Sequence, residues 1–176
     1  MVGDRPRMII FNRADQADPA VTARWLAWFK GKGYAVMETD AKTGKGVNQF
    51  SSTVKLALKD KIAAWQAKGQ VGRPVRVMVV GVPNVGKSTF INKVAKRKSA
   101  KAGDRPGVTR GKQWVSVDNG LDLLDTPGIL WPKFEDETTG MHLAYTGAVR
   151  DEIMDSEALA CGLLELLRDR YPGALA

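Results

Sequence analysis

The chain has almost none of the residues from which metal clusters and disulfide frameworks are built. Its 176 residues include one cysteine, Cys161, and one histidine, His142. A Cys/His metal cluster or a disulfide within the chain is therefore excluded, and the composition suits a reducing compartment. No long apolar stretch follows the basic N-terminal residues, so we expect neither a signal peptide nor a membrane anchor. The expected location is the cytoplasm, or an organelle matrix if a transit peptide has been removed.

Acidic residues are too few to balance the basic ones. The chain has 27 lysines and arginines against 19 acidic residues, a net charge of +8. This excess favours polyanionic partners such as nucleic acid, although a soluble basic protein without such a partner fits the charge equally well. Many basic residues lie between Lys93 and Lys112, where only Asp104 opposes them. They are Lys96, Arg97, Lys98, Lys101, Arg105 and Arg110.

Apolar patterns of strand and helix type alternate along the chain and predict an α/β fold with helices on both faces of a sheet. Strands are expected at 7–12, 34–39 and 75–80, with a hairpin of 114–117 and 121–124. Helices are expected after Asp18, over 47–68, from 87 to about 98, and in two segments beyond Gly128. The expected apolar faces are Val21, Trp25, Leu26 and Phe29, then Phe50, Val54, Leu58, Ile62 and Trp65, and last Leu159, Leu163, Leu166 and Leu167.

The segment GVPNVGKST, residues 81–89, matches the pattern G-x-x-x-x-G-K-[S/T] between an expected strand and helix. Its glycines let backbone amides cradle phosphates at the helix N-terminus. Lys87 would reach the β- and γ-phosphates, and the Ser88 hydroxyl would bind Mg²⁺. The alternative is a glycine-rich turn with an exposed lysine. The residues expected to bind nucleotide here are Asn84, Val85, Gly86, Lys87, Ser88 and Thr89.

Two further segments fit a phosphate site. Asp125-Thr126-Pro127-Gly128 follows the hairpin, where Asp125 could hold Mg²⁺ through water and the Gly128 amide could approach the γ-phosphate. Thr109, in the loop between the two motifs, could supply a second protein contact on Mg²⁺ once a γ-phosphate orders that loop. The alternatives are a simple turn and an ordinary flexible loop. We expect Lys87, Thr109 and Gly128 to be the catalytic residues.

Asn12-Arg13-Ala14-Asp15 follows the first strand and predicts a guanine-recognising corner. The Asp15 carboxylate can accept hydrogen bonds from N1 and N2 of guanine, a donor pair that adenine lacks. Asn12 can donate to the purine, and the Arg13 stem can lie over its plane. Because base recognition precedes the phosphate loop, the order indicates a circularly permuted GTPase. An ATP-using P-loop enzyme, in which this tetrapeptide is accidental, is the alternative.

The motifs NRAD, DAK, GVPNVGKST, DRPGVTR and DTPGILWPKFEDE, in that order, resemble the ribosome biogenesis GTPase A family (YlqF/RbgA-type) over nearly the whole chain. The resemblance implies a three-layer α/β/α P-loop GTPase with a mostly parallel sheet. It also implies slow, partner-stimulated GTP hydrolysis in assembly of the large ribosomal subunit, with rRNA as a partner and neither membrane nor DNA. A nucleotide-dependent RNA-binding module with negligible turnover remains an alternative.

The expected domain is 1–150, with a base-recognition half (1–68), a linker (69–74) and a phosphate and switch half (75–150). Residues 151–176 would begin a C-terminal helical region. The resemblance further implies an N-terminal histidine segment and a strand that this chain lacks, which would leave a gap between the strands led by Met8 and Val75. The chain is therefore expected to be a fragment, also without the family's RNA-contacting domain.

The resemblance assigns some further residues. A backbone amide at Asp40-Ala41 would contact the guanine carbonyl, and Asn84 would position a stimulatory K⁺. Arg13 stands where lysine is commoner, and Asp40 where serine or asparagine is usual. Apolar Ile129 and Leu130 occupy the region of a water-orienting glutamine. His142 is expected to lie on the surface.

Overall fold

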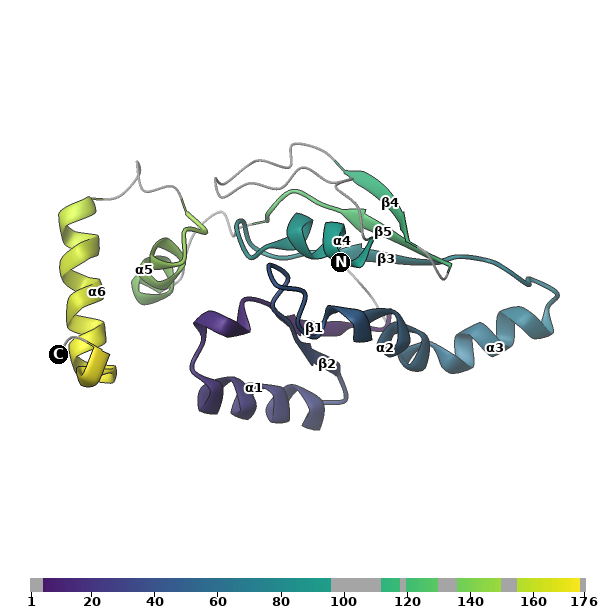
Figure 1. Cartoon of the computed structure of the whole chain (residues 1–176), viewed down its shortest axis with the longest axis horizontal. Coiled ribbons are helices and arrows are strands. Elements are labelled where there is room, and N and C mark those ends of the chain that lie inside the picture. The colour runs from purple at the N-terminus through teal and green to yellow at the C-terminus, as the bar shows by residue number, and fades with distance from the viewer. Residues whose placement is uncertain (1–4, 96–111, 118–119, 130–135, 150–154, 175–176) are drawn as a thin grey trace.

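The computed structural model describes residues 5–95, 112–117, 120–129, 136–149 and 155–174 (Figure 1). The strands are β1 (Met8–Phe11), β2 (Ala35–Glu38), β3 (Val75–Val79), β4 (Gln113–Val117) and β5 (Leu121–Asp125). The helices are α1 (Pro19–Gly31), α2 (Phe50–Ala57), α3 (Lys59–Ala67), α4 (Lys87–Val94), α5 (Glu137–Tyr145) and α6 (Ser156–Arg170). Short 3₁₀ helices are η1 (Ala14–Gln16), η2 (Val47–Gln49) and η4 (Pro172–Ala174).

The described strands form two sheets. One pairs β1 with β2 in parallel, with Met8 opposite Ala35. The other has the order β3-β5-β4, in which β3 and β5 are parallel and the predicted hairpin pairs β4 with β5 in antiparallel fashion. The α/β class is confirmed, but the described strands do not form one continuous sheet. The strands led by Met8 and Val75 lie in different sheets, in agreement with the gap expected between them.

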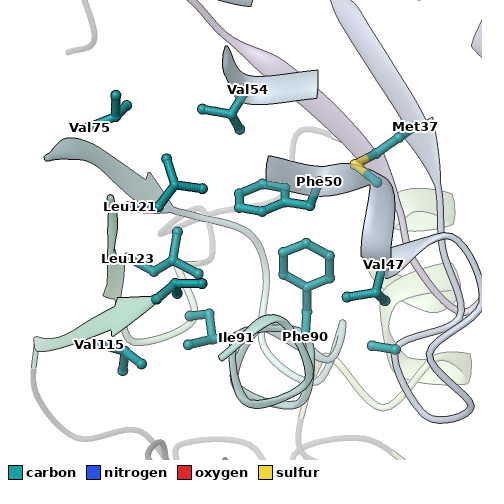
Figure 2. Packing of buried hydrophobic residues seen from close by; sticks show 12 residues of the cluster. Met37, Val47, Phe50, Val54, Val75, Phe90, Ile91, Val115, Leu121 and Leu123 are labelled. Carbon is teal, nitrogen blue, oxygen red and sulfur yellow. The ribbon is translucent and has the colours of Figure 1, made fainter. Parts of the chain in front are cut away.

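One hydrophobic core joins the two sheets. Phe50 on α2 packs edge-to-face on Phe90 of α4, with ring centroids 5.1 Å apart. Around this pair lie Met37 from β2 and Leu121 and Leu123 from β5, all buried (Figure 2). The N-terminal half and the phosphate-loop half therefore share their apolar surface. The shared core fixes the ends of the parallel strands in both sheets relative to each other.

The helix predicted over 47–68 is interrupted. It is divided into η2, α2 and α3, and the chain leaves helical geometry at Leu58, where φ is −112° and ψ is 13°. The predicted apolar stripe survives the break, because Phe50 and Val54 are buried and the three residues after them pack against the core. Those three are Leu58, Ile62 and Trp65. No glycine or proline marks the interruption, so packing overrides local propensity here.

Helix α1 begins where the sequence predicts. The Asp18 carboxylate caps it by accepting hydrogen bonds from the amides of Ala20 (2.8 Å) and Val21 (3.2 Å), and Pro19 occupies the first helical position. Its predicted apolar face is only partly covered, since Trp25 is 50% exposed. Within the described residues, no helix is both long and apolar enough to cross a lipid bilayer.

Candidate nucleotide site

The predicted phosphate loop connects β3 to α4, as the motif requires. Gly86 is the N-cap of α4 and has a φ of +85°, a left-handed conformation that glycine adopts without strain. A methyl group on Gly86 would also lie 2.5 Å from Asn12 Nδ2. Glycine at this position therefore serves both the turn and the close approach of the base-recognition segment.

Lys87 folds back over the loop. Its ammonium group donates hydrogen bonds to the carbonyl oxygens of Gly81 (3.1 Å) and Val82 (2.8 Å). Partial burial lowers the pKa of Lys87 below its ordinary value, and the nearby charge of Asp125 opposes that shift. The Lys87 ammonium group thus lies against the predicted phosphate loop, and the Asp125 charge is close enough to influence it.

Ser88 and Asp125, the two predicted Mg²⁺ ligands within the described residues, are in contact. The Ser88 hydroxyl donates to Asp125 Oδ2 at 2.7 Å. Asp125 ends β5 and is 1% exposed, and its Oδ1 is buried without a hydrogen-bond partner in the described part of the chain. Such an oxygen is costly unless something pairs with it. A hydroxyl and a carboxylate oxygen are hard ligands that suit Mg²⁺, so these residues fit the ion.

Asn12 connects the two halves of the site. Its Oδ1 accepts hydrogen bonds from the Ala41 amide (3.0 Å) and the Thr39 hydroxyl (3.1 Å). These two donors fix the orientation of the side chain, and its Nδ2 donates to the carbonyl oxygen of Val85 in the phosphate loop (2.8 Å). The predicted base-recognition segment and the phosphate loop therefore meet directly. One Nδ2 hydrogen makes that contact, and the predicted hydrogen bond to a purine would use the other.

Arg13 also reaches the phosphate loop. It adopts a left-handed conformation, with φ of 58° and ψ of 36°, and its Nη1 lies 3.4 Å from the carbonyl oxygen of Asn84. The next residue is fixed by a hydrogen bond from the Ala14 amide to the carbonyl oxygen of Thr39 (3.2 Å). Asp15 follows in η1 with an exposed side chain. An exposed carboxylate on this anchored turn is accessible to a purine edge.

Asp40 organises the loop that follows β2. Its carboxylate accepts hydrogen bonds from the Lys42 amide (2.8 Å), the Thr43 amide (3.3 Å) and the Thr43 hydroxyl. The Thr43 hydroxyl bond is the main reason that the pKa of Asp40 lies below its ordinary value. This geometry gives Asp40 a local structural role. The Ala41 amide, expected near the guanine carbonyl, donates to Asn12 in this structure.

Thr39 is a site residue that the sequence analysis missed. It is buried, and its hydroxyl is one of the two donors that orient Asn12. Its amide also donates to the carbonyl oxygen of Phe11 at 2.8 Å, which continues the pairing of β1 and β2. In the sequence Thr39 is an ordinary residue at the end of an expected strand, so its role could not be predicted there.

Gly128 packs against the phosphate loop. A methyl group on Gly128 would lie 2.6 Å from Pro83 Cα, too close for any side chain. The next residue, Ile129, donates its amide to the carbonyl oxygen of Gly81 at 3.2 Å, while its side chain is 62% exposed. The segment after β5 thus packs against the phosphate loop.

Some predicted residues are not part of this geometry. Thr109, Leu130 and most of the basic stretch from Lys93 to Lys112 lie outside the described residues. His142 is exposed on α5, as predicted.

Comparison with known proteins agrees with this geometry. Residues 76–160 match the family model described as 50S ribosome-binding GTPase. The ribosome biogenesis GTPase A of Priestia megaterium is 49% identical over 176 residues, which cover 99% of this chain and 61% of the relative. The chain belongs to the ribosome biogenesis GTPase A family.

Solved structures of this family share the fold. A GDP-bound structure of TM YlqF superposes with a TM-score of 0.58 at 31% identity, covering 92% of this chain and 59% of that one. GNP-bound YlqF from T. maritima gives a TM-score of 0.59 at 32% identity, covering 92% and 58%. The fold is therefore the circularly permuted P-loop GTPase fold of this family. The chain spans about three fifths of the length of these relatives.

Proposed function

We propose that this chain binds GTP and GDP with Mg²⁺ and hydrolyses GTP slowly, as the nucleotide-binding part of an assembly switch for the large ribosomal subunit. The observation that carries the proposal is the Asn12 side chain, which contacts the phosphate loop at Val85 O and the base-recognition loop at Ala41 N. These contacts hold a predicted purine-binding corner next to a predicted phosphate cradle, and one nucleotide can occupy both.

In this proposal each residue has a specific role. Asp15 accepts hydrogen bonds from the guanine edge, Asn12 donates to the purine, and the Arg13 stem covers its face. Lys87 and the loop amides hold the phosphates, and the Gly128 amide approaches the γ-phosphate. Ser88 and Asp125 would hold Mg²⁺, which when bound would neutralise negative charge on the phosphates. Thr109 would add a further contact to Mg²⁺.

A competition titration tests the nucleotide assignment. A fluorescent GDP analogue is bound to the protein and displaced with GTP, ATP and XTP in turn. We expect GTP to displace the probe at far lower concentration than ATP, because only guanine offers the donor pair that Asp15 accepts. Equal displacement by ATP would instead support an ATP-using P-loop enzyme and exclude guanine recognition.

Slow turnover is expected from the residue that follows Gly128. Ile129 has an exposed, apolar side chain close to the position of a water-orienting glutamine, and such a side chain cannot polarise water. Stimulation by ribosomal subunits would complete the site, and K⁺ positioned by Asn84 would add to it. Turnover measured with and without subunits, in K⁺ and in Na⁺, distinguishes this GTPase from a binding module without turnover.

The proposed partner is the large ribosomal subunit with its rRNA, in the cytoplasm. The net charge of +8 and the basic stretch from Lys93 to Lys112 support a polyanionic partner. Binding to subunits should weaken steeply with salt, and reversing the charges of Lys96, Arg97 and Lys98 should weaken it further. Unchanged affinity in that triple variant would remove this stretch from the proposed interface.

A further inference from the structure

The phosphate loop has a further long-range contact, with the residues that follow α5. The Asn84 side chain donates from Nδ2 to the backbone carbonyl oxygen of Gly147 over 2.8 Å, in a partly buried position. The two residues are 63 positions apart in the sequence. Gly147 lies two positions after Tyr145, the last residue of α5, and this helix contributes none of the predicted nucleotide contacts.

The Gly147 carbonyl group, which accepts this hydrogen bond, is held in place by the way α5 ends. Gly147 has a φ of +70°, and its amide donates to the carbonyl oxygen of Ala144 at 2.9 Å. The Ala148 amide donates to the carbonyl oxygen of Leu143 at 2.8 Å, and Ala148 is buried. This pair of bonds is the Schellman motif, which ends a helix in a single defined geometry. The Gly147 carbonyl group therefore has little freedom to follow Asn84 if the phosphate loop moves.

Asn84 itself also occupies a constrained position. Its φ is 58°, in the left-handed region that asparagine tolerates better than most residues. Its backbone carbonyl oxygen faces the Arg13 guanidinium, at 3.4 Å. Asn84 thus links the base-recognition corner, the phosphate loop and the end of α5 within one residue.

Helix α5 extends this connection toward the C-terminal helix. A methyl group on Gly162 of α6 would lie 2.6 Å from the Tyr145 hydroxyl and 3.1 Å from Met141 Cε on α5. Glycine at this position lets the two helices approach closely, and Figure 1 shows them side by side at one end of the molecule. Because the two helices are in close contact, a change in the position of α5 would displace α6.

We infer that Asn84 is a positioning residue that couples nucleotide occupancy of the phosphate loop to the end of α5, and through α5 to α6. This inference rests on the proposed nucleotide site and adds a route by which that site regulates the helices following it. Energetic coupling of this kind is reciprocal: nucleotide stabilises the α5 end, and a loosened α5 end weakens nucleotide binding by the same factor.

The test is amide hydrogen exchange at Gly147 and Ala148, whose hydrogens are held by the helix-ending bonds, in the absence and presence of GDP. Asn84→Asp keeps the size of the side chain but replaces the donor with an oxygen that repels the Gly147 carbonyl oxygen. We expect exchange at these two amides to be about three- to tenfold faster in Asn84→Asp than in the wild type, because the variant loses one hydrogen bond. Asn48→Asp, an exposed change in η2, is the matched control and should leave both amides unchanged.

The second readout is the effect of GDP on the same two exchange rates, measured at GDP concentrations that saturate each variant. GDP should slow exchange at Gly147 and Ala148 in the wild type, and this difference should disappear in Asn84→Asp. Gly147→Ala, which strains the helix end at a φ of +70°, should weaken GDP binding without touching the nucleotide. If both amides exchange in Asn84→Asp at the wild-type rate, the proposed coupling is wrong.

If GDP does not bind the wild type, the proposed function is wrong instead. The exchange rates measured without GDP would still decide whether Asn84 holds the end of α5.

Discussion

The side-chain amide of Asn12 donates to the carbonyl oxygen of Val85 at 2.8 Å, although 73 positions separate the two residues in the sequence. Asn12 follows the first strand of one sheet, and Val85 lies in the loop after the first strand of the other. The contact therefore joins two parts of the chain that do not share a sheet. It places the segment predicted to read the base against the segment predicted to hold the phosphates, in the reverse of their usual chain order.

Removing the Asn12 side chain should separate the base-recognition segment from the phosphate loop. Asn12→Ala deletes one donor and leaves the Ala41 amide and the Thr39 hydroxyl without their acceptor. We expect GDP affinity to fall about 100-fold, equivalent to about 2.7 kcal/mol, because two to three hydrogen bonds are lost. Calorimetric titration measures the change. Asn48→Ala, at an exposed position, should bind GDP like the wild type, and an equal loss in both variants would mean that the effect is not local.

Gly128 should tolerate no side chain. A methyl group there would lie 2.6 Å from both Cα and Cγ of Pro83, so Gly128→Ala must displace the phosphate loop. We expect a loss of about 1–3 kcal/mol of unfolding free energy in urea, together with weaker GDP binding. Gly31→Ala is the matched control, because nothing lies within 4 Å of the added methyl group. A neutral Gly128→Ala variant would show that the close packing on Pro83 is unimportant.

Asp15 should set the choice of base. Asp15→Asn replaces a carboxylate acceptor by an amide that can donate to the xanthine carbonyl, so preference should move from GTP toward XTP. The side chain is exposed, and the unfolding free energy should therefore stay within about 0.5 kcal/mol of the wild type. Competition binding with both nucleotides measures the change. A variant that still prefers GTP would place base recognition elsewhere.

Asp125 should be required for the effect of Mg²⁺. Asp125→Asn keeps the size of the side chain but removes the charge beside Ser88, so the tightening of GDP binding by Mg²⁺ should be reduced at least about tenfold, or about 1.4 kcal/mol. Titrations with Mg²⁺ and with EDTA give this difference. Binding without Mg²⁺ should change much less, and an unchanged Mg²⁺ effect would exclude Asp125 as a ligand.

The pKa of Lys87 should lie below its ordinary value. Burial lowers its pKa and the Asp125 charge opposes that effect, so Asp125→Asn should lower the pKa of Lys87 further. Between the folded and unfolded pKa values the unfolded chain binds more protons, so this group's contribution to stability increases as pH rises. The Cε resonance of Lys87, followed by NMR against pH in the wild type and in Asp125→Asn, measures the pKa of Lys87 in both proteins. A pKa of Lys87 at or above 10.5 in the wild type would contradict them.

Local patterns predicted most of the elements and the segments that the structure brings together at the candidate site. Asp18 predicted the start of α1, the apolar runs at 114–117 and 121–124 predicted the β4–β5 hairpin, and GVPNVGKST predicted the loop between β3 and α4. In each case the residues that determine the structure are adjacent in sequence. Turn and cap chemistry is local, so a single sequence reveals it.

Features that depend on distant contacts were not predictable in the same way. The break at Leu58 has no local signal, since packing of the helix on the shared core decides it. Thr39 appeared to be an ordinary strand residue, and only its hydrogen bond to Asn12 reveals its role. The half-exposed Trp25 matches a helical apolar pattern as well as its half-buried neighbours do. Periodicity shows which residues share a face of a helix, but not whether another element covers that face.

The structure of the complex with GDP tests the central claim most directly. The account predicts one nucleotide with its guanine edge within hydrogen-bond distance of the Asp15 carboxylate and its β-phosphate against the ammonium group of Lys87. A nucleotide held at Lys87 with its base directed away from Asp15 would contradict it.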